Sequence, residues 1–286
     1  MHFADYKTIL SPKNGMNIYR GCTHGCIYCD SRSVCYQMTH DFEDVEVKRN
    51  APEILEEQLK KRRKSAMIFT GAMSDPYIHL EEKLQYTRRC LEVIEKYRFG
   101  VAILTKSDRV LRDLDLLKKI NRKTKCVVQM TLTTFDEKLC QLIEPNVSAT
   151  AKRVEALKVL RDAEIPTVVW LGPFLPFIND DEENLKRLLD CCIEAGVKGI
   201  IYFGLSVTMR EGNREYFYEK LEQNFPGLKE KYIKEFRNQY VCKSPNYKPS
   251  CVNVKKICKE KGILYNSEAF DYMSEFESKL GQMTLF

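Results

Sequence analysis

Short apolar runs alternate with longer amphipathic stretches along most of this chain, from about residue 15 to residue 205. The runs have the length of strands and contain mainly apolar and β-branched residues, as expected for strands covered on both faces of a parallel sheet. They occupy residues 16–19, 66–69, 101–104, 126–132, 166–171 and 198–203.

The stretches between these runs repeat their apolar residues at the spacing of a helix. They occupy residues 52–64, 81–97, 109–121, 136–143, 150–163 and 181–195. Consecutive strand-helix units with right-handed crossovers predict an α/β fold, either a doubly wound sheet or a barrel.

The chain changes character after residue 208. An aromatic-rich amphipathic region at 213–236 is followed by a basic loop at 243–250 and a helical pattern near 252–261. Because no Gly/Ser-rich or Pro-rich linker precedes this region, we interpret it as a helical extension of the main domain. The predicted organisation is an N-terminal segment, a core, a helical extension and a short tail, at residues 1–14, 15–208, 209–280 and 281–286.

Composition narrows the class of protein. The chain has 286 residues, of which 44% are hydrophobic and 30% are charged. A chain of this length buries a sizeable core without covalent cross-links, which excludes disordered proteins and mini-proteins. The first residues lack the pattern of a secretory signal, and no run approaches the ~18 apolar residues of a membrane-spanning helix. We therefore expect a cytoplasmic protein that does not enter a membrane.

Twelve cysteines are the unusual feature of this composition. Disulfides are rare in a reducing compartment, so these cysteines either bind a metal or serve as small buried apolar residues. Three of them, Cys22, Cys26 and Cys29, follow the first predicted strand at C-x3-C-x2-C spacing. Three thiolates in so short a loop can hold one corner of an iron-sulfur cube. Since four cysteines would close such a cluster, three leave one iron open for chemistry.

A zinc site is the alternative for the same three cysteines. Its fourth ligand would come from elsewhere in the chain, with His24 and His40 nearest in sequence. Zinc ligands usually occur as two separated pairs, which is not the spacing found here.

The cysteine motif after the first of six strand-helix units resembles the signature of the radical S-adenosylmethionine (SAM) enzymes. This resemblance implies a partial (β/α)6 barrel with a [4Fe-4S] cluster whose open iron binds SAM. It also implies reductive cleavage of SAM to a 5'-deoxyadenosyl radical, with electrons from a reductant such as flavodoxin or ferredoxin. Tyr28, before the third cysteine, would then lie beside the adenine.

Further positions match the family at the ends of predicted strands, where loops of barrel enzymes build active sites. Residues 70–76 resemble the segment that binds the SAM amino group, and they include Gly71, Ser74 and Asp75. The resemblance further implies that Lys106 pairs with the SAM carboxylate, that Thr131 faces the lumen and that Gly172 admits the adenine. The alternatives are a simple turn at 70–76, because Ser, Asp and Pro all favour turns, and a solvated loop lysine at 106.

Within the family, the chain is most similar to the spore photoproduct lyase group of DNA repair enzymes. One position departs from that group, because Ala72 stands where those lyases carry the cysteine that returns a hydrogen atom to the product radical. Cys35 is a candidate replacement, and its alternative is a small buried residue. Arg210 is a candidate for contact with substrate, and its alternative is a surface ion pair with Glu211.

The remaining cysteines divide into two groups. The first group lies on apolar helix or strand faces and is expected in the core: Cys90, Cys126, Cys140, Cys191 and Cys192. The second group, Cys242, Cys251 and Cys258, lies in the C-terminal extension. Its wide spacing leaves a second iron-sulfur cluster open as a hypothesis.

Charge and the chain end point toward nucleic acid. The net charge is +6, and residues 229–261 hold ten Lys or Arg against three Glu, interleaved with tyrosines. Basic residues beside aromatics suit a nucleic-acid backbone and unstacked bases. The last residues resemble the peptide with which bacterial repair proteins bind the sliding clamp, through Gln282, Met283, Leu285 and Phe286. The sequence therefore favours a nucleic-acid lesion or modified base as the substrate, with a peptide or small molecule as the alternative.

Overall fold

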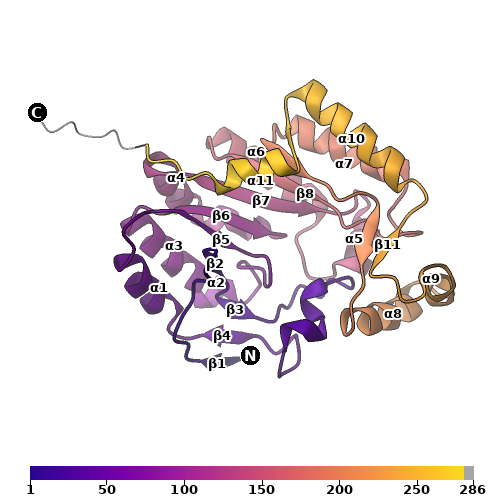
Figure 1. Ribbon diagram of the computed structural model, residues 1–286, viewed down its shortest axis with the longest axis horizontal. Coiled ribbons are helices and arrows are strands. Elements are labelled where there is room, and N and C mark those ends of the chain that lie inside the picture. The colour runs from indigo at the N-terminus through magenta and orange to yellow at the C-terminus, as the bar shows by residue number, and fades with distance from the viewer. Residues whose placement is uncertain (280–286) are drawn as a thin grey trace, which may run out of the picture.

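The structure, a computed structural model, describes residues 1–279. Its largest element is a sheet of seven strands in which all neighbours are parallel (Figure 1). The predicted α/β fold, a partial barrel, is confirmed. From edge to edge the strands are β12 (Leu264–Tyr265), β9 (Gly199–Ile201), β8 (Thr167–Leu171), β7 (Cys126–Leu132), β6 (Gly100–Thr105), β5 (Met67–Thr70) and β2 (Gly15–Met16).

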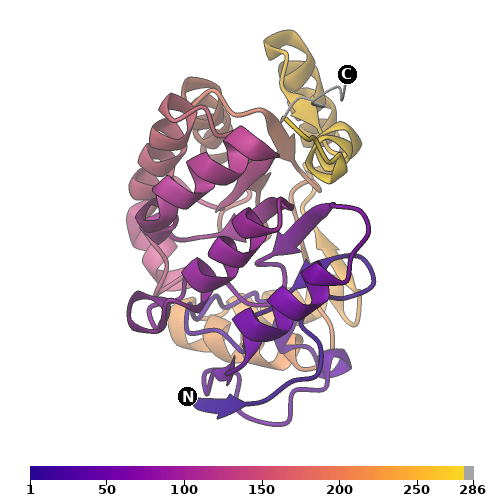
Figure 2. The same ribbon diagram turned by 90° about the vertical axis from the view of Figure 1, so that its left-hand side faces the viewer.

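Helices cover one face of this sheet and bury the main hydrophobic core against it. Figure 2 looks onto this layer, in which α1 packs against α3 and α3 against α4. The predicted helix at 81–97 is interrupted at Gln85, where φ is 53°, and the one at 109–121 begins as a 3-10 segment before α4. The elements are α1 (Ala51–Lys60), α2 (Glu81–Leu84), α3 (Tyr86–Lys96), η3 (Asp108–Asp113), α4 (Leu114–Lys123), α5 (Glu137–Ile143), α6 (Thr150–Asp162) and α7 (Glu182–Glu194).

The opposite face of the sheet carries a smaller core that the C-terminal region completes. Helix α11 (Ser267–Ser274) places Ala269 and Met273 against inward-facing residues of the strands, among them Val127 and Val168. Strand β12 joins the sheet beside β9. The extension is therefore not purely helical, because part of it belongs to the core sheet.

The N-terminal part forms a second sheet in the order β1 (His2–Ala4), β4 (Glu46–Lys48) and β3 (Tyr19–Arg20). The predicted strand at 16–19 is in fact divided between two sheets. Met16 pairs with Thr70 of the large sheet, whereas Tyr19 pairs with Val47 of the small one. Two short 3-10 helices follow, η1 (Asp30–Arg32) and η2 (Val34–Tyr36).

The C-terminal extension begins with a two-stranded antiparallel sheet of β10 (Ser206–Thr208) and β11 (Val241–Lys243). Helices α8 (Asn213–Asn224) and α9 (Leu228–Phe236) connect these strands, and α10 (Tyr247–Lys261) follows them. In Figure 1, α9 lies below β11 and α10 above it. The helices that carry most of the basic residues of 229–261 therefore lie on different sides of β11.

Two expectations concern regions beyond the sheet. No helix within residues 1–279 has the length and apolarity that crossing a membrane requires. The residues assigned to clamp binding, Gln282, Met283, Leu285 and Phe286, lie outside the described residues.

Candidate active site

The three cysteines of the motif lie in the loop between β3 and η1, which we call the cysteine loop (residues 21–29). Cys22 and Cys26 are buried and Cys29 is half-buried. All three line one small cavity of about 120 Å³ at the end of strands β5 and β6. The loop thus brings the three thiols to one space, as the spacing predicts.

The distances between the sulfurs separate the two metals considered for this loop. A tetrahedral zinc ion with Zn–S bonds of about 2.3 Å needs its sulfurs about 3.8 Å apart. Within residues 1–279, the three sulfurs do not all lie within 4.8 Å of one another. In an iron-sulfur cube each thiolate binds a different iron, which requires a wider spacing. This spread is too wide for a single zinc ion bound by all three thiols.

Burial controls the charge of these side chains. Burial and the Asp75 carboxylate raise the pKa of the Cys22 thiol to about 12, and burial raises the pKa of Cys26 well above its ordinary value. Both thiols are therefore protonated without metal, so iron must displace their protons. Burial also lowers the pKa of His24, which keeps that imidazole neutral.

A buried ion pair anchors the cysteine loop to the core. The Tyr28 hydroxyl donates to the Glu144 carboxylate, which also accepts hydrogen bonds from Arg153 Nη2 at 2.7 Å and from Thr133 at 2.9 Å. Both charged side chains have 0% exposure. Burial alone would raise the pKa of Glu144, but Arg153 and then Lys106 hold it at about 2. The carboxylate is therefore ionised at neutral pH. Sequence reasoning missed this pair.

Asp75 joins three segments of the site. Its Oδ1 accepts from the Thr105 hydroxyl at 2.7 Å and from the Tyr77 amide at 2.8 Å, and its Oδ2 accepts from the Lys106 amide at 2.7 Å. His24 Nδ1 lies 3.4 Å from Oδ2. These contacts occupy three of the roughly four acceptor sites of the carboxylate. Asp75 therefore links the Lys106 backbone to His24 of the cysteine loop, and its contact with the SAM amino group stays a prediction.

Ser74 and Gly71 bring the loop after β5 close to its neighbours. The Ser74 hydroxyl donates to the Gly21 carbonyl at 2.5 Å. Gly71 has φ +99°, and a Cβ there would lie 1.8 Å from the carbonyl oxygen of Leu104. Only glycine fits that approach.

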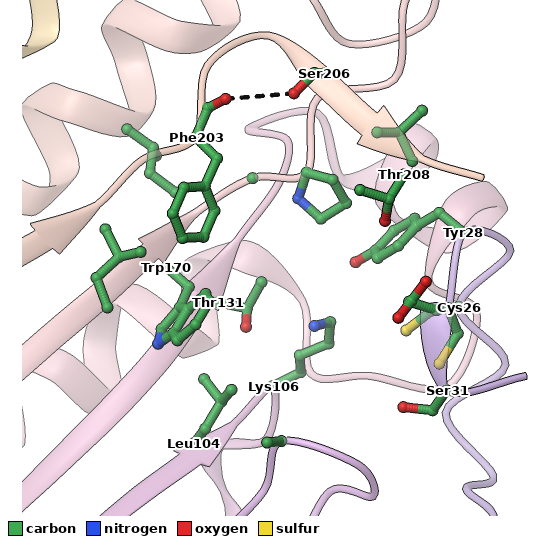
Figure 3. A pocket seen from close by; sticks show the side chains of 18 of the residues that line it. Cys26, Tyr28, Ser31, Leu104, Lys106, Thr131, Trp170, Phe203, Ser206 and Thr208 are labelled. Atoms are coloured by element: carbon green, nitrogen blue, oxygen red, sulfur yellow. Dashed lines mark hydrogen bonds between the residues drawn. The ribbon is translucent and has the colours of Figure 1, made fainter. Parts of the chain in front are cut away.

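A larger cavity of about 320 Å³ continues from the small one, with which it shares Cys26, Cys29, Lys106 and Thr131 among its lining residues. Figure 3 shows the Lys106 side chain projecting into it between Thr131 and Cys26. The Lys106 Nζ lies 5.8 Å from the centre of the Tyr28 ring. The expected residues Tyr28 and Gly172 also line this cavity, so it gathers most of the predicted SAM-binding residues.

Arg210 and Cys35 lie in contact with each other. Arg210 Nη1 donates to the Cys35 sulfur at 3.3 Å, its Nη2 donates to the Tyr240 hydroxyl at 2.7 Å, and its Nε lies 3.4 Å from Asp30 Oδ1. Asp30 also lines the large cavity, which connects this group to the site. The structure contradicts the alternative for Cys35, which is exposed, and it gives Arg210 a partly exposed ion pair whose partner is Asp30 instead of Glu211.

Sequence reasoning missed the aromatic wall of the large cavity. Trp170 and Phe203 line it with ring centres 6.0 Å apart, and the Phe203 side chain is 57% exposed. The Trp170 indole donates to Gln129 Oε1 at 2.7 Å, which fixes the ring. The alternation of strand β8 could have revealed Trp170, because it lies opposite Thr131 in the register.

The other cysteines occupy packed positions. Four of the five expected core cysteines are buried and Cys191 is half-buried. Cys242 packs in the aromatic core of the extension, whereas Cys258 packs in the main core and Cys251 beside it. Their separation into two cores argues against a second iron-sulfur cluster.

Three thiols lining one cavity at the end of a parallel partial barrel, beside a larger open cavity, are the arrangement expected of an iron-sulfur enzyme. The chain belongs to the radical SAM superfamily, whose family model matches residues 16–189. A [4Fe-4S] cluster and SAM are therefore its cofactors, as predicted. When bound, the reduced cluster supplies the electron that cleaves SAM to a radical.

Two uncharacterized proteins from different organisms are similar to this chain along most of its length. An uncharacterized protein of Methanocaldococcus jannaschii is 32% identical over 213 residues, which are 74% of this chain and 76% of that protein. An uncharacterized protein of Mycobacterium tuberculosis is 28% identical over 235 residues, which are 78% of this chain but only 66% of that protein.

Solved structures share the fold. Spore photoproduct lyase with bound AdoMet and dinucleoside spore photoproduct matches with a TM-score of 0.56 and 14% identity, over 74% of this chain and 62% of the lyase chain. A radical SAM methyltransferase from Kitasatospora setae, with cobalamin and a [4Fe-4S] cluster bound, matches with a TM-score of 0.50 and 12% identity, over 68% and 37%. The chain thus spans less than two thirds of either protein. Since the two differ in reaction, the fold does not select one.

Proposed function

We propose that this radical SAM enzyme acts on a base in a nucleic acid, taken up unstacked from its neighbours. The observation that carries the proposal is the aromatic wall of the large cavity. Trp170 and Phe203 present ring faces and edges on the side of the cavity away from the cysteines (Figure 3). A planar base can stack there, and base stacking on an aromatic side chain contributes about 1–3 kcal/mol.

The position of Trp170 suits this role. The Gln129 side chain holds its indole nitrogen, so the ring is fixed before substrate arrives. The cavity also contains Lys106 and Thr131 near the cysteines, where SAM would bind. A base on the aromatic wall would therefore face the adenosine part of SAM, which is the part that becomes the radical.

Positive charge around the cavity supports a polyanionic substrate. Lys243 of β11 is exposed and pairs in register with Ser206, which lines the cavity. Arg210 pairs with Asp30, which lines the cavity, and helices α9 and α10, which carry exposed lysines, lie on the two sides of β11 (Figure 1). A nucleic-acid strand crossing the mouth would meet cations on both sides.

The likeness to spore photoproduct lyase supports the nucleic-acid substrate but not the same reaction. Ala72 lines both cavities at the position where that group carries its hydrogen-donating cysteine. We propose that Cys35, beside Arg210, gives the hydrogen atom to the product radical. Its thiyl radical would then return to a thiol with one electron from flavodoxin or ferredoxin and one proton from water.

Binding of a fluorescent single-stranded oligonucleotide tests the substrate class. We expect the affinity to fall with salt as phosphate contacts require, and to fall about tenfold or more in Trp170→Leu. Lys243→Gln should reduce the slope of log binding constant against log salt concentration by about 0.7, the value for one phosphate contact on a single strand. The matched control Lys60→Gln changes an exposed lysine on α1 and should leave both quantities unchanged. Salt-independent or absent binding would favour a peptide or small-molecule substrate instead.

A further inference from the structure

We propose a second metal site, for a divalent ion of the zinc class, formed by His2, His40 and Asp44. Within residues 1–279, no other group of three His, Cys, Asp or Glu residues places its donor atoms within 4.8 Å of one another. The three come from β1 and from the loop between η2 and β4. Two imidazoles and a carboxylate form a donor set that zinc accepts readily.

His40 offers an unused nitrogen. Its Nδ1 lies 3.0 Å from the Asp41 carbonyl oxygen. A carbonyl only accepts hydrogen bonds, so Nδ1 carries the proton and Nε2 carries a lone pair. This Nε2 is buried from solvent and has no hydrogen-bond partner. A backbone carbonyl behind one nitrogen with a free lone pair on the other is the arrangement of a metal-binding histidine.

His2 faces a carboxylate on each side. Its Nδ1 lies 2.9 Å from Asp44 Oδ2 and its Nε2 lies 3.5 Å from Glu46 Oε2. A neutral imidazole has one proton and so satisfies only one of the two. A metal ion would replace the proton that Nδ1 shares with Asp44, and the proton of the ring would then lie on Nε2 toward Glu46. The Tyr6 hydroxyl donates to Glu46 and holds it in position.

The distances leave room for an ion after a small closure. Zinc with bonds of about 2.0–2.1 Å places its ligand atoms about 3.3 Å apart. The His2 and Asp44 atoms already lie 2.9 Å apart, and the two imidazole rings meet edge to face with centres at 4.8 Å. Asp44 Oδ1, 2.8 Å from the Met1 nitrogen, leaves Oδ2 for the ion. A water would complete the tetrahedron.

The site lies behind the cysteine loop. Phe42, between His40 and Asp44 in sequence, accepts a hydrogen bond from the Cys22 amide at 3.0 Å. Gly21 packs so closely on the same carbonyl that a Cβ there would lie 2.4 Å from its oxygen. A metal that ties the loop of His40 and Asp44 to β1 would therefore fix the support of the first cluster ligand. Its role is structural, and it does not rest on the proposed substrate.

Zinc titration of the protein with its iron-sulfur cluster intact tests this site, with free zinc followed by a chromophoric chelator. We expect one zinc per chain in addition to the cluster iron. His40→Gln should weaken zinc binding at least about a hundredfold, and Glu46→Gln about ten- to a hundredfold. His79→Gln, which changes an exposed histidine outside the site, should bind zinc like the unchanged protein.

Two further measurements separate this site from the cysteine loop and from misfolding. A protein with Cys22, Cys26 and Cys29 all changed to serine should still bind one zinc, and zinc should raise the melting temperature of the unchanged protein but not of folded His40→Gln. The proposal is overturned if the unchanged protein binds no zinc, or if His40→Gln binds it equally well. If the variant with the three cysteines changed to serine no longer binds zinc, the ion belongs to the cysteine loop and the proposal is likewise overturned.

Discussion

Removing the Arg153 guanidinium is the most direct test of how the cysteine loop is held. In Arg153→Met the Glu144 carboxylate stays buried without its cation, although Tyr28 and Thr133 still donate to it. Breaking a buried ion pair from one side costs about 3–5 kcal/mol. The pKa of the Glu144 carboxyl is held at about 2, below its ordinary 4.5, by Arg153 first and then by Lys106, so Arg153 supplies the largest part of this stabilisation.

The assay is guanidinium unfolding at pH 7, followed by far-UV circular dichroism. Arg153→Met should lower the free energy of unfolding by about 3–5 kcal/mol. The matched control is Arg187→Met, which breaks an exposed pair with Glu183 on α7 and should change stability little. If the free energy of unfolding of Arg153→Met lies within about 1 kcal/mol of that of the unchanged protein, the ion pair does not anchor the loop.

The same carboxylate gives a pH dependence with a definite sign. Because the pKa of Glu144 is depressed in the folded protein, its stabilisation is complete above about pH 4.5 and is lost as the pH falls toward 2. Stability of the unchanged protein should therefore fall across this window. Glu144→Gln should be less stable at pH 7 and should lose less stability between pH 4.5 and pH 2. Equal slopes for the two proteins would contradict an ionised Glu144.

Three further predictions concern single side chains. Tyr28→Phe removes one hydrogen-bond donor to buried Glu144 and should lower the free energy of unfolding by about 1–3 kcal/mol, with iron content unchanged. A loss of iron would instead place Tyr28 in cluster binding. Lys106→Met should raise the KM for SAM about 10- to 100-fold in 5'-deoxyadenosine assays, since a charge-assisted hydrogen bond contributes about 1.5–3 kcal/mol; an unchanged KM would remove Lys106 from the SAM site. Cys258→Ser and the unchanged protein should each contain four iron atoms per chain. A higher iron content in the unchanged protein than in Cys258→Ser would instead indicate a second cluster that Cys258 binds.

Local features of the site were predictable from the sequence, whereas contacts between distant segments were not. The cysteine spacing confines three thiols to one loop, and the apolar runs identify buried parallel strands. Chain order then places the loops of Ser74 and Lys106 at one end of the sheet. Each of these conclusions depends on residues that are close in sequence or on a regular topology.

The missed features depend on partners that a pattern does not name. Glu144 and Arg153 look like ordinary charged residues, and only the fold buries them together. Strand β12 has two residues, too few to show a period. The run at 16–19 reads as one strand, but its two ends pair with different sheets.

Deuterium transfer tests the central claim most directly. The reduced enzyme would be incubated with SAM and with single-stranded oligonucleotides deuterated on their bases and sugars, and 5'-deoxyadenosine would be analysed by mass spectrometry. The proposed function predicts deuterium in 5'-deoxyadenosine, and its loss in Trp170→Leu while unlabelled product still forms. If the unchanged enzyme forms 5'-deoxyadenosine without deuterium from any of these oligonucleotides, a nucleic-acid base is not its substrate.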